Sequence, residues 1–410
     1  MKKIAIRSLW ALGLVGLLLG GAALFAKPSA RREAPQEPAS QQKPTPKPEE
    51  QKPAENKTEA QLEDLPEPKQ TGVFAAYQER AQKLLDQMTP EQMIGQVFVV
   101  RCPEDSQLKE TQALHPGGLL LFGRDFKGKT ADQVRQTIQG YQQTSQTPLF
   151  IGADEEGGTV CRVSGNPGLR AERFPSPQQL YQAGGLEAAE ADGVEKSRLL
   201  LSLGINLNLA PVADVSQNPQ DFIYPRTWGQ DAESTAQYVA TTVQTAQKEG
   251  VGAVMKHFPG YGGNADTHTG SARDNRPLSQ FEQADLRPFQ AGIEAGGQGI
   301  LVSHNIVECL DPQQPASISP AVYQYLRKEM GFTGVALTDD LAMGAMKEGQ
   351  EEHPAVQALR AGADFLVVSE LPSAASAVGQ AIEQGTLSQA RVDQAALRVL
   401  EWKLALGILE

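Results

Sequence analysis

Eight short apolar runs recur along the chain, and stretches with helical periodicity separate most of them. The runs occupy residues 96–100, 118–122, 149–154, 205–212, 252–257, 299–304, 334–339 and 363–369. The helical stretches include residues 130–144, 234–249, 278–295 and 320–330. Apolar strands that alternate with amphipathic helices predict a parallel sheet with helical crossovers. Eight such units fit an α/β fold, a (β/α)8 TIM-type barrel in a single domain. A doubly wound open sheet is the alternative.

Charged or imidazole side chains stand at the C-terminal ends of six of these runs. They are Arg101, Asp154, Asp214, Lys256 with His257, His304, and Asp339 with Asp340. A barrel gathers these ends around one mouth, which predicts a shared pocket for a polar, hydroxyl-rich ligand. Because side chains alternate along a strand, one carboxylate of Asp339 and Asp340 should face the mouth and the other should pack or hydrogen-bond behind it. An N-cap pair for the following helix is the alternative.

The N-terminal part of the chain differs from the rest in composition. Basic residues precede an uncharged apolar run at residues 9–26, a pattern typical of a signal peptide, and the run is also long enough for a membrane anchor. Residues 27–72 are rich in Pro, Glu, Gln and Lys, as in a disordered spacer. We expect a signal peptide or anchor at 1–26, this spacer at 27–72 and a catalytic domain at 73–410. The protein would then lie outside the cytoplasm, secreted or tethered to the cell membrane through residues 9–26.

Charge and cysteine content exclude some classes of partner. The net charge of -12 argues against nucleic acid or an anionic membrane surface as the ligand. Cys102, Cys161 and Cys309 are odd in number and lack metal-like spacing, which favours free thiols over a disulfide scaffold. We expect no metal ion and no cofactor, and we expect a monomer.

A glycine- and proline-rich segment at residues 256–268 carries two of the five histidines. Gly and Pro at this density place Asp266 and His268 on an irregular loop, where either a proton-transfer site or a merely solvated loop would fit. A carboxylate nucleophile and a proton donor on such a loop suit retaining glycoside hydrolysis. An imidazole donor would be a variant, in which Asp266 holds the His268 ring in one tautomer.

These segments resemble glycoside hydrolase family 3, in its β-N-acetylglucosaminidase branch. The resemblance rests on residues 256–262 (KHFPGYG) with 266–268 (DTH), and on 154–158 (DEEGG), 210–214 (APVAD), 334–343 (GVALTDDLAM) and 361–364 (AGAD). The resemblance covers roughly residues 75–410, and the matching segments follow one another in the family's order.

The resemblance implies a role for each matching residue. Asp339 would be the nucleophile, His268 the general acid/base and Asp266 its partner. The positions that contact the sugar would be Asp154, Arg162, Arg226, Lys256 and His257. The activity implied is that of a retaining exo-β-N-acetylglucosaminidase. It would release terminal β-linked N-acetylglucosamine from peptidoglycan- or chitin-derived glycans through a covalent glycosyl-Asp intermediate.

The chain departs from the family pattern at three positions. Tyr261 replaces the usual histidine, Glu155 stands where glutamine is frequent, and Thr159 replaces a frequent arginine. We expect altered contacts at Tyr261 rather than lost activity. Many β-glucosidases of the family place their acid on a C-terminal domain, whereas this sequence ends at Glu410. We therefore expect the acid to come from the barrel.

Two other functions fit the same residues. A phosphorylase is one, because a neutral imidazole repels phosphate less than a carboxylate would. A tethered glycan-binding module without catalysis is the other, although Asp266, His268 and Asp339 are all present.

Overall fold

The computed structural model describes residues 72–264, 272–346 and 352–410, all within one compact unit, Lys57–Glu410. The predicted signal peptide or anchor, the spacer up to residue 71, and Asp266 and His268 lie outside the described residues. None of the helices in the described ranges is both long and apolar enough to cross a bilayer.

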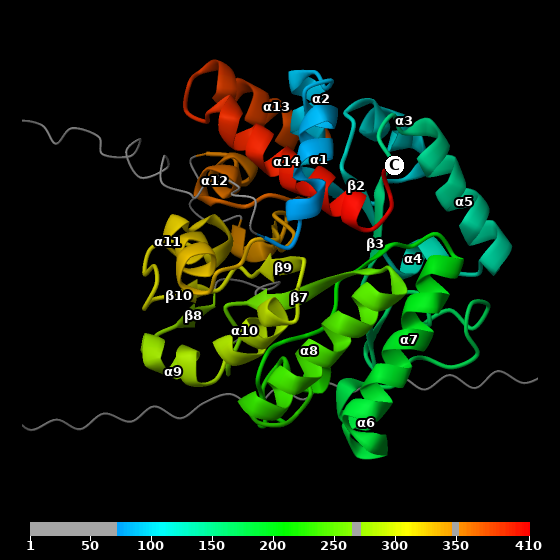
Figure 1. Ribbon diagram of the computed structural model, residues 1–410, viewed down its shortest axis with the longest axis vertical. Coiled ribbons are helices and arrows are strands. Elements are labelled where there is room, and N and C mark those ends of the chain that lie inside the picture. The colour runs from blue at the N-terminus through cyan, green and yellow to red at the C-terminus, as the bar shows by residue number, and fades with distance from the viewer. Residues whose placement is uncertain (1–71, 265–271, 347–351) are drawn as a thin grey trace, which may run out of the picture. The chain divides into compact units, whose positions relative to one another are not determined.

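Eight parallel strands form the centre of the fold (Figure 1). They are β1 (Phe98–Arg101), β2 (Gly118–Leu121), β3 (Phe150–Ala153), β6 (Leu207–Asn208), β7 (Gly252–Phe258), β9 (Gly299–Val302), β11 (Val335–Thr338) and β12 (Leu366–Val368). Their order is β11-β9-β7-β6-β3-β2-β1-β12, and a parallel bridge between Leu337 and Phe365 joins the two ends. The predicted TIM-type barrel is confirmed, and each of the eight apolar runs overlaps one of its strands.

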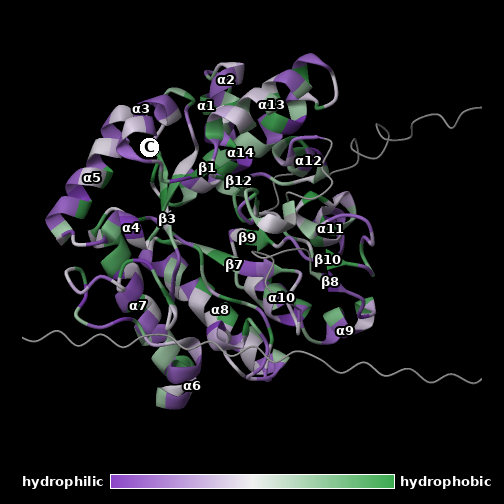
Figure 2. Ribbon diagram, turned by 180° about the vertical axis from the view of Figure 1, so that it is seen from behind, coloured by the Kyte–Doolittle hydropathy of each residue, from purple (hydrophilic) through white to green (hydrophobic). Residues whose placement is uncertain are grey.

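Helices surround the strands in Figure 1. They are α1 (Gln78–Leu85), α2 (Pro90–Gln96), α3 (Asp105–Ala113), α4 (Gly123–Phe126), α5 (Ala131–Thr144), α6 (Pro177–Gly184), α7 (Leu186–Ser202), α8 (Ala232–Glu249), α9 (Leu278–Gln283), α10 (Leu286–Glu294), α11 (Pro320–Gln324), α12 (Pro354–Ala361), α13 (Leu371–Glu383) and α14 (Gln389–Ala405). Within the described ranges, four short strands lie outside the barrel: β4 (Glu155–Gly157), β5 (Val160–Cys161), β8 (Arg273–Asp274) and β10 (Ile306–Val307). Figure 2 shows mainly hydrophobic strands such as β3, β7 and β9 inside helices of mixed polarity.

The bottom of the barrel is filled by one large side chain. Trp402 of α14 is fully buried and packs with Phe150 at a ring-centroid distance of 4.9 Å. Both β7 and β9 begin with glycine where they pass this indole. A Cβ at Gly299 would lie 2.7 Å from a ring carbon of Trp402, and one at Gly252 would lie 3.0 Å from another. The N-terminal end of the barrel is therefore closed by packing, and the mouth at the C-terminal end is available for ligand.

One predicted helix is divided. Residues 278–295 form α9 and α10, which are separated at Ala284 and Asp285. Pro288 lacks the N–H that would bond to the Ala284 carbonyl in a continuous helix, and its ring would clash with that carbonyl. Asp285 is buried, and it accepts hydrogen bonds from the Arg276 guanidinium at 2.8 and 3.2 Å. The expectation of a single helix was wrong because it overlooked this proline.

Candidate active site

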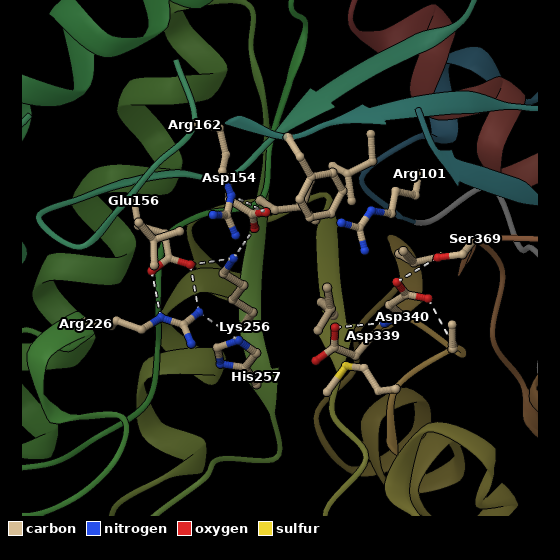
Figure 3. A pocket seen from close by; sticks show the side chains of 18 of the residues that line it. Arg101, Asp154, Glu156, Arg162, Arg226, Lys256, His257, Asp339, Asp340 and Ser369 are labelled. Atoms are coloured by element: carbon tan, nitrogen blue, oxygen red, sulfur yellow. Dashed lines mark hydrogen bonds and ion pairs between the residues drawn. The ribbon is translucent and has the colours of Figure 1, made fainter. Parts of the chain in front are cut away.

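A pocket of about 660 Å³ opens at the C-terminal ends of the barrel strands. Its charged and imidazole lining residues are Arg101, Asp154, Glu156, Arg162, Arg226, Lys256, His257, Asp339 and Asp340. Figure 3 shows them in two groups: a hydrogen-bonded cluster around Lys256 on one side, and Arg101, Asp340 and Ser369 on the other, with Asp339 between them. The pocket therefore contains eight of the residues that the sequence placed at strand ends or on sugar-contacting positions, together with Glu156.

Two buried cations and two carboxylates form the cluster. Lys256 Nζ lies 2.6 Å from Asp154 Oδ1 and 2.7 Å from Glu156 Oε1. Arg226 binds Glu156 through two nitrogens, at 2.8 and 2.9 Å. Burial opposes ionisation of Glu156, but the charges of Lys256 and Arg226 outweigh it and hold the pKa of this carboxyl well below its usual range. Burial likewise disfavours the Lys256 ammonium, yet Asp154 and Glu156 raise its pKa. Glu156, Lys256 and Arg226 are therefore charged at neutral pH, and the contacts among the four groups hold them in place.

His257 extends this cluster in a defined orientation. Its Nδ1 lies 2.8 Å from Asp214 Oδ2, and its Nε2 lies 3.2 Å from an Arg226 nitrogen. Because a guanidinium only donates, Nε2 accepts from Arg226 and Nδ1 donates to Asp214. Asp214 is fully buried and also accepts from the backbone N–H groups of His257 and Tyr261. It orients the imidazole from behind the pocket.

Neighbouring residues of β7 both reach the pocket because the strand is irregular there. The pairing of β7 with β9 shifts register between Lys256 and Phe258, so the strict alternation of side chains is interrupted. The Lys256–His257 and Phe258–Pro259 peptide bonds are cis.

Asp339 and Asp340 follow the end of β11, and both line the pocket. Asp339 Oδ1 accepts from the Asp340 N–H at 2.8 Å. Asp340 accepts from the Ala342 N–H and, at 3.2 Å, from Ser369 Oγ. The expectation that only one of the two aspartates would face the mouth was wrong, because the strand ends at Thr338 and its alternation does not extend beyond that residue. The other part of the expectation, a hydrogen-bonded second carboxylate, is met by Asp340.

His304 supports the site without entering the pocket. Its ring is fully buried, with Nδ1 2.7 Å from Ser317 Oγ and Nε2 2.9 Å from the Asp340 carbonyl oxygen. It therefore steadies the backbone that carries the two aspartates.

A short hairpin of β4 and β5 brings Arg162 to the pocket. Arg162 Nε lies 3.6 Å from Asp154 Oδ2, and its guanidinium lies 5.4 Å from the Phe122 ring centroid. This Nε is buried without a hydrogen-bond partner among the described residues. Since a buried donor without a partner is costly, a ligand oxygen would complete the site here.

The N-terminal domain of glycosyl hydrolase family 3 matches residues 89–402. The chain belongs to glycosyl hydrolase family 3. It is a glycoside hydrolase, and its substrate is a carbohydrate.

Curated relatives narrow the likeness within family 3. The chain is 31% identical to β-hexosaminidase LpqI of Mycobacterium tuberculosis over 335 residues, 77% of this chain and 83% of LpqI. It is 30% identical to a β-hexosaminidase of Nitrosomonas eutropha, over 66% of this chain and 79% of that protein. A family 3 β-N-acetylglucosaminidase from Paenibacillus has a similar structure, with a TM-score of 0.74 and 30% identity over 78% of this chain and 63% of that chain.

Tyr261, one of the three departures from the family 3 pattern, is buried behind the pocket. Its ring meets the His257 ring edge-on at a centroid distance of 5.0 Å and also packs against Phe222. Its backbone N–H donates to Asp214 Oδ1 at 2.7 Å. The tyrosine thus packs against His257 without being part of the pocket lining. No group of three metal-binding side chains occurs among the residues that the structure describes.

Glu156 is the functional residue that sequence reasoning missed. Residues 154–158 drew attention for Asp154 and for the two glycines that follow. However, Asp154 and Glu156 are two positions apart in an extended segment, and side chains at that spacing share a face. This spacing was a signal that could have revealed the second carboxylate.

Proposed function

We propose that this protein is a retaining exo-β-N-acetylglucosaminidase that releases terminal β-linked N-acetylglucosamine. The observation that carries the proposal is the cluster of Asp154, Lys256, Glu156, Arg226 and His257 on one side of the pocket, with Asp339 beyond it. A dense set of fixed donors and acceptors suits the hydroxyls and acetamido oxygen of a single terminal sugar. The name of the Paenibacillus β-N-acetylglucosaminidase supports this sugar, and the names of the β-hexosaminidase relatives support an N-acetylhexosamine more generally.

In this proposal Asp339 forms the covalent intermediate. Its carboxylate oxygen attacks the anomeric carbon, and the bond from that carbon to the glycosidic oxygen breaks. His268, oriented by Asp266, gives its proton to the departing oxygen. In the second step His268 takes a proton from water, which attacks the anomeric carbon and frees Asp339 with net retention. Lys256, Arg226 and Arg162 would hold the sugar while Asp339 attacks.

The natural substrates would be fragments of peptidoglycan or chitin. Export by the N-terminal segment would place the enzyme outside the cytoplasm, next to cell-wall glycans. Tethering through residues 9–26 and a monomeric state remain part of this proposal.

A 2-fluoro glycosyl fluoride with the gluco configuration tests the chemistry directly. The fluorine slows the second step, so the glycosyl-enzyme should accumulate, and peptide mapping should find the label on Asp339. Asp339→Asn should abolish both the labelling and the turnover while binding of N-acetylglucosamine, measured by calorimetry, persists. A label on another residue, or Asp339→Asn activity near that of wild type, would contradict the assignment. Release of sugar 1-phosphate instead of free sugar in phosphate buffer would identify a phosphorylase.

A further inference from the structure

Asn208 binds the backbone of the segment that carries the two carboxylates of the cluster. It is the last residue of β6, and it is buried. Its Oδ1 accepts from the Glu155 N–H at 3.0 Å, and its Nδ2 donates to the Glu155 carbonyl at 3.2 Å. Since a backbone N–H only donates and a carbonyl oxygen only accepts, these two bonds fix which way the amide faces. Regular pairing of β3 with β6 ends at Ala153 and Asn208, so this side chain continues the contact where the backbone pairing stops.

These two hydrogen bonds control the orientation of Asp154 and Glu156 together. The N–H of Glu155 belongs to the peptide group that joins it to Asp154, and its carbonyl belongs to the peptide group that joins it to Glu156. Each peptide group is planar, so holding both planes restricts the directions in which the two neighbouring side chains leave the backbone. Both carboxylates contact Lys256 Nζ, at 2.6 and 2.7 Å. A small rotation of the backbone at Glu155 would therefore disturb both contacts at once.

Lys196 of α7 holds the next carbonyl of the same segment. Its Nζ donates to the Glu156 carbonyl at 3.2 Å and pairs with Asp192 Oδ2 at 2.9 Å, and both side chains are buried. Because Asp192 balances the charge, the ammonium serves as a donor here without adding an unpaired buried charge behind the cluster. Three polar groups of the backbone at residues 155 and 156 are thus bonded to side chains of β6 and α7.

Asn206 makes the same kind of contact at the other end of β3. It is partly buried and precedes β6. Its Oδ1 accepts from the Ile151 N–H at 2.8 Å, and its Nδ2 donates to the Leu149 carbonyl at 3.3 Å. Phe150, between these two residues, packs on Trp402 at the closed end of the barrel. The two asparagines therefore match in chemistry and differ in place, since Asn208 bonds to the segment that lines the pocket and Asn206 bonds at the closed end.

We propose that Asn208 is a positioning residue for the terminal sugar and acts through Asp154 and Glu156. Asn208 itself is not part of the pocket lining, whereas both carboxylates are. The proposal rests on the proposed function, because it takes the cluster as the site of the terminal sugar. Loss of the amide should weaken the hold on that sugar by displacing the two carboxylates, while the barrel stays folded.

Asn208→Ala and Asn206→Ala, made in the full-length protein, form a matched pair of variants. Asn208→Ala should lower kcat/KM on an aryl N-acetylglucosaminide by about ten- to a hundredfold, since a misplacement of about 1 Å can cost a hundredfold. Asn206→Ala removes the same kind of hydrogen bonds and should lower the thermal unfolding midpoint to a similar extent, yet its kcat/KM should stay close to that of wild type. Asn208→Ser should lose less activity than Asn208→Ala, because its hydroxyl can both donate and accept.

A double-mutant cycle with Asp154→Asn shows whether Asn208 acts through the cluster. The loss of kcat/KM caused by Asn208→Ala should be about threefold or more smaller in the Asp154→Asn background than in wild type, as for residues that share one network. Asn206→Ala should show no such coupling, because effects at independent sites multiply. If Asn208→Ala does not fold, Asn208→Ser takes its place in the same cycle.

Equal losses of kcat/KM from the two asparagine variants would reduce Asn208 to a structural residue and overturn the proposal. Losses that multiply in the cycle, or an Asn208→Ala enzyme as active as wild type, would overturn it as well. Failure of the proposed function is recognised in the wild type, which would then neither cleave the aryl substrate nor carry the fluorosugar label on Asp339, and this inference would fall with it. An active wild type with uncoupled losses would refute the inference alone.

Discussion

Glu156 has a disproportionate effect on the site because it neutralises two cations at once. Its side chain is 1% exposed and contacts both Lys256 and Arg226. In Glu156→Gln the amide NH2 would point its hydrogens at the donor nitrogens of Lys256 or Arg226. The neutral side chain would also leave part of the positive charge of these two residues unbalanced. Removing one partner of a buried pair costs about 3–5 kcal/mol. We expect a lower unfolding midpoint and a loss of kcat/KM of at least about a hundredfold, through displacement of Lys256. Thermal unfolding and steady-state kinetics on an aryl N-acetylglucosaminide measure both effects.

Glu155→Gln is the matched control for this variant. Glu155 is equally buried but accepts hydrogen bonds from the N–H groups of Val163 and Ser164, which follow β5, and burial raises its pKa. The same change should therefore be milder here. The dependence of stability on acid pH also distinguishes Glu156→Gln from Glu155→Gln. The lowered pKa of Glu156 contributes stability that is present above its ordinary value of 4.5 and lost as the pH falls below it. That loss should be absent in Glu156→Gln, and equal damage from both variants would contradict the special role of Glu156.

Individual side chains were predictable where a residue ended an apolar run. Asp154, Lys256, His257 and Asp339 follow from that rule together with barrel geometry. The same rule also selects Asp214 and His304, which end apolar runs but support the pocket from outside it. It therefore does not distinguish a side chain that lines the pocket from one that holds the lining in place. That difference depends on which way a few backbone residues turn after the strand ends, and it is decided by hydrogen bonds between segments far apart in the sequence. The acid–base pair predicted at Asp266 and His268 lies outside the described residues and stays a prediction.

At the scale of elements, the seam between β11 and β12 depends on one buried carboxylate. The Asp364 carboxylate accepts a hydrogen bond from the Ala336 N–H at 3.0 Å, and the Asp364 backbone N–H donates to the Ala336 carbonyl at 2.8 Å. Three buried arginines surround this carboxylate. They are Arg327, Arg391 and Arg398. Burial opposes the charge, but the three guanidinium groups lower the pKa of Asp364. The hydrogen bonds of this side chain thus help to close the barrel between β11 and β12, where a single backbone bridge, Leu337 with Phe365, joins the two strands.

Asp364→Ala should therefore weaken the whole barrel. It leaves three cations buried together and opens the last strand pair, so we expect a loss of more than about 3 kcal/mol in unfolding free energy. Urea titration followed by circular dichroism measures it. Arg287→Ala removes a surface pair with Glu233 and should change stability little. Comparable midpoints for the two variants would show that the seam does not depend on Asp364.

The helices and strands were predictable from the periodicity of apolar residues, except where a single residue such as a proline interrupts a helix. Each of the eight strands lies within one of the apolar runs or extends one residue beyond its C-terminal end, since a buried parallel strand needs a continuous apolar segment. The stretch at 278–295 has helical periodicity throughout, but Pro288 divides it. The stretch at 320–330 likewise changes from α11 to a π-helical turn, Tyr325–Glu329. Periodicity identifies the face that is buried, whereas local backbone chemistry decides where each helix begins and ends.

For the molecule as a whole, the barrel positions the active-site side chains and also leaves ionisable groups at its closed end. Glu401 and Lys403 belong to the same turn of α14 as Trp402, and all three are buried. Burial, which outweighs the opposing effect of Arg398, raises the pKa of Glu401 to about 7. Its contribution to stability is thus present at acid pH and lost as the pH rises toward 7. The closed end therefore ties the stability of the whole barrel to pH, although it takes no part in the chemistry.

Lys403 should make the protein more stable in mild alkali than at neutral pH. Burial lowers its pKa from 10.5 to about 7, so between these values the unfolded chain binds the extra proton and stability rises with pH. We expect the unfolding free energy to be roughly 2 kcal/mol higher at pH 9 than at pH 7, measured by urea titration. Lys403→Met should remove this rise. It also deprives Gln96 Oε1 of a donor at 2.8 Å, which costs about 1–3 kcal/mol and offsets part of its gain at pH 7. Lys109→Met, at the surface, should keep the wild-type slope, and a Lys403→Met curve parallel to that of wild type would contradict the role of this lysine.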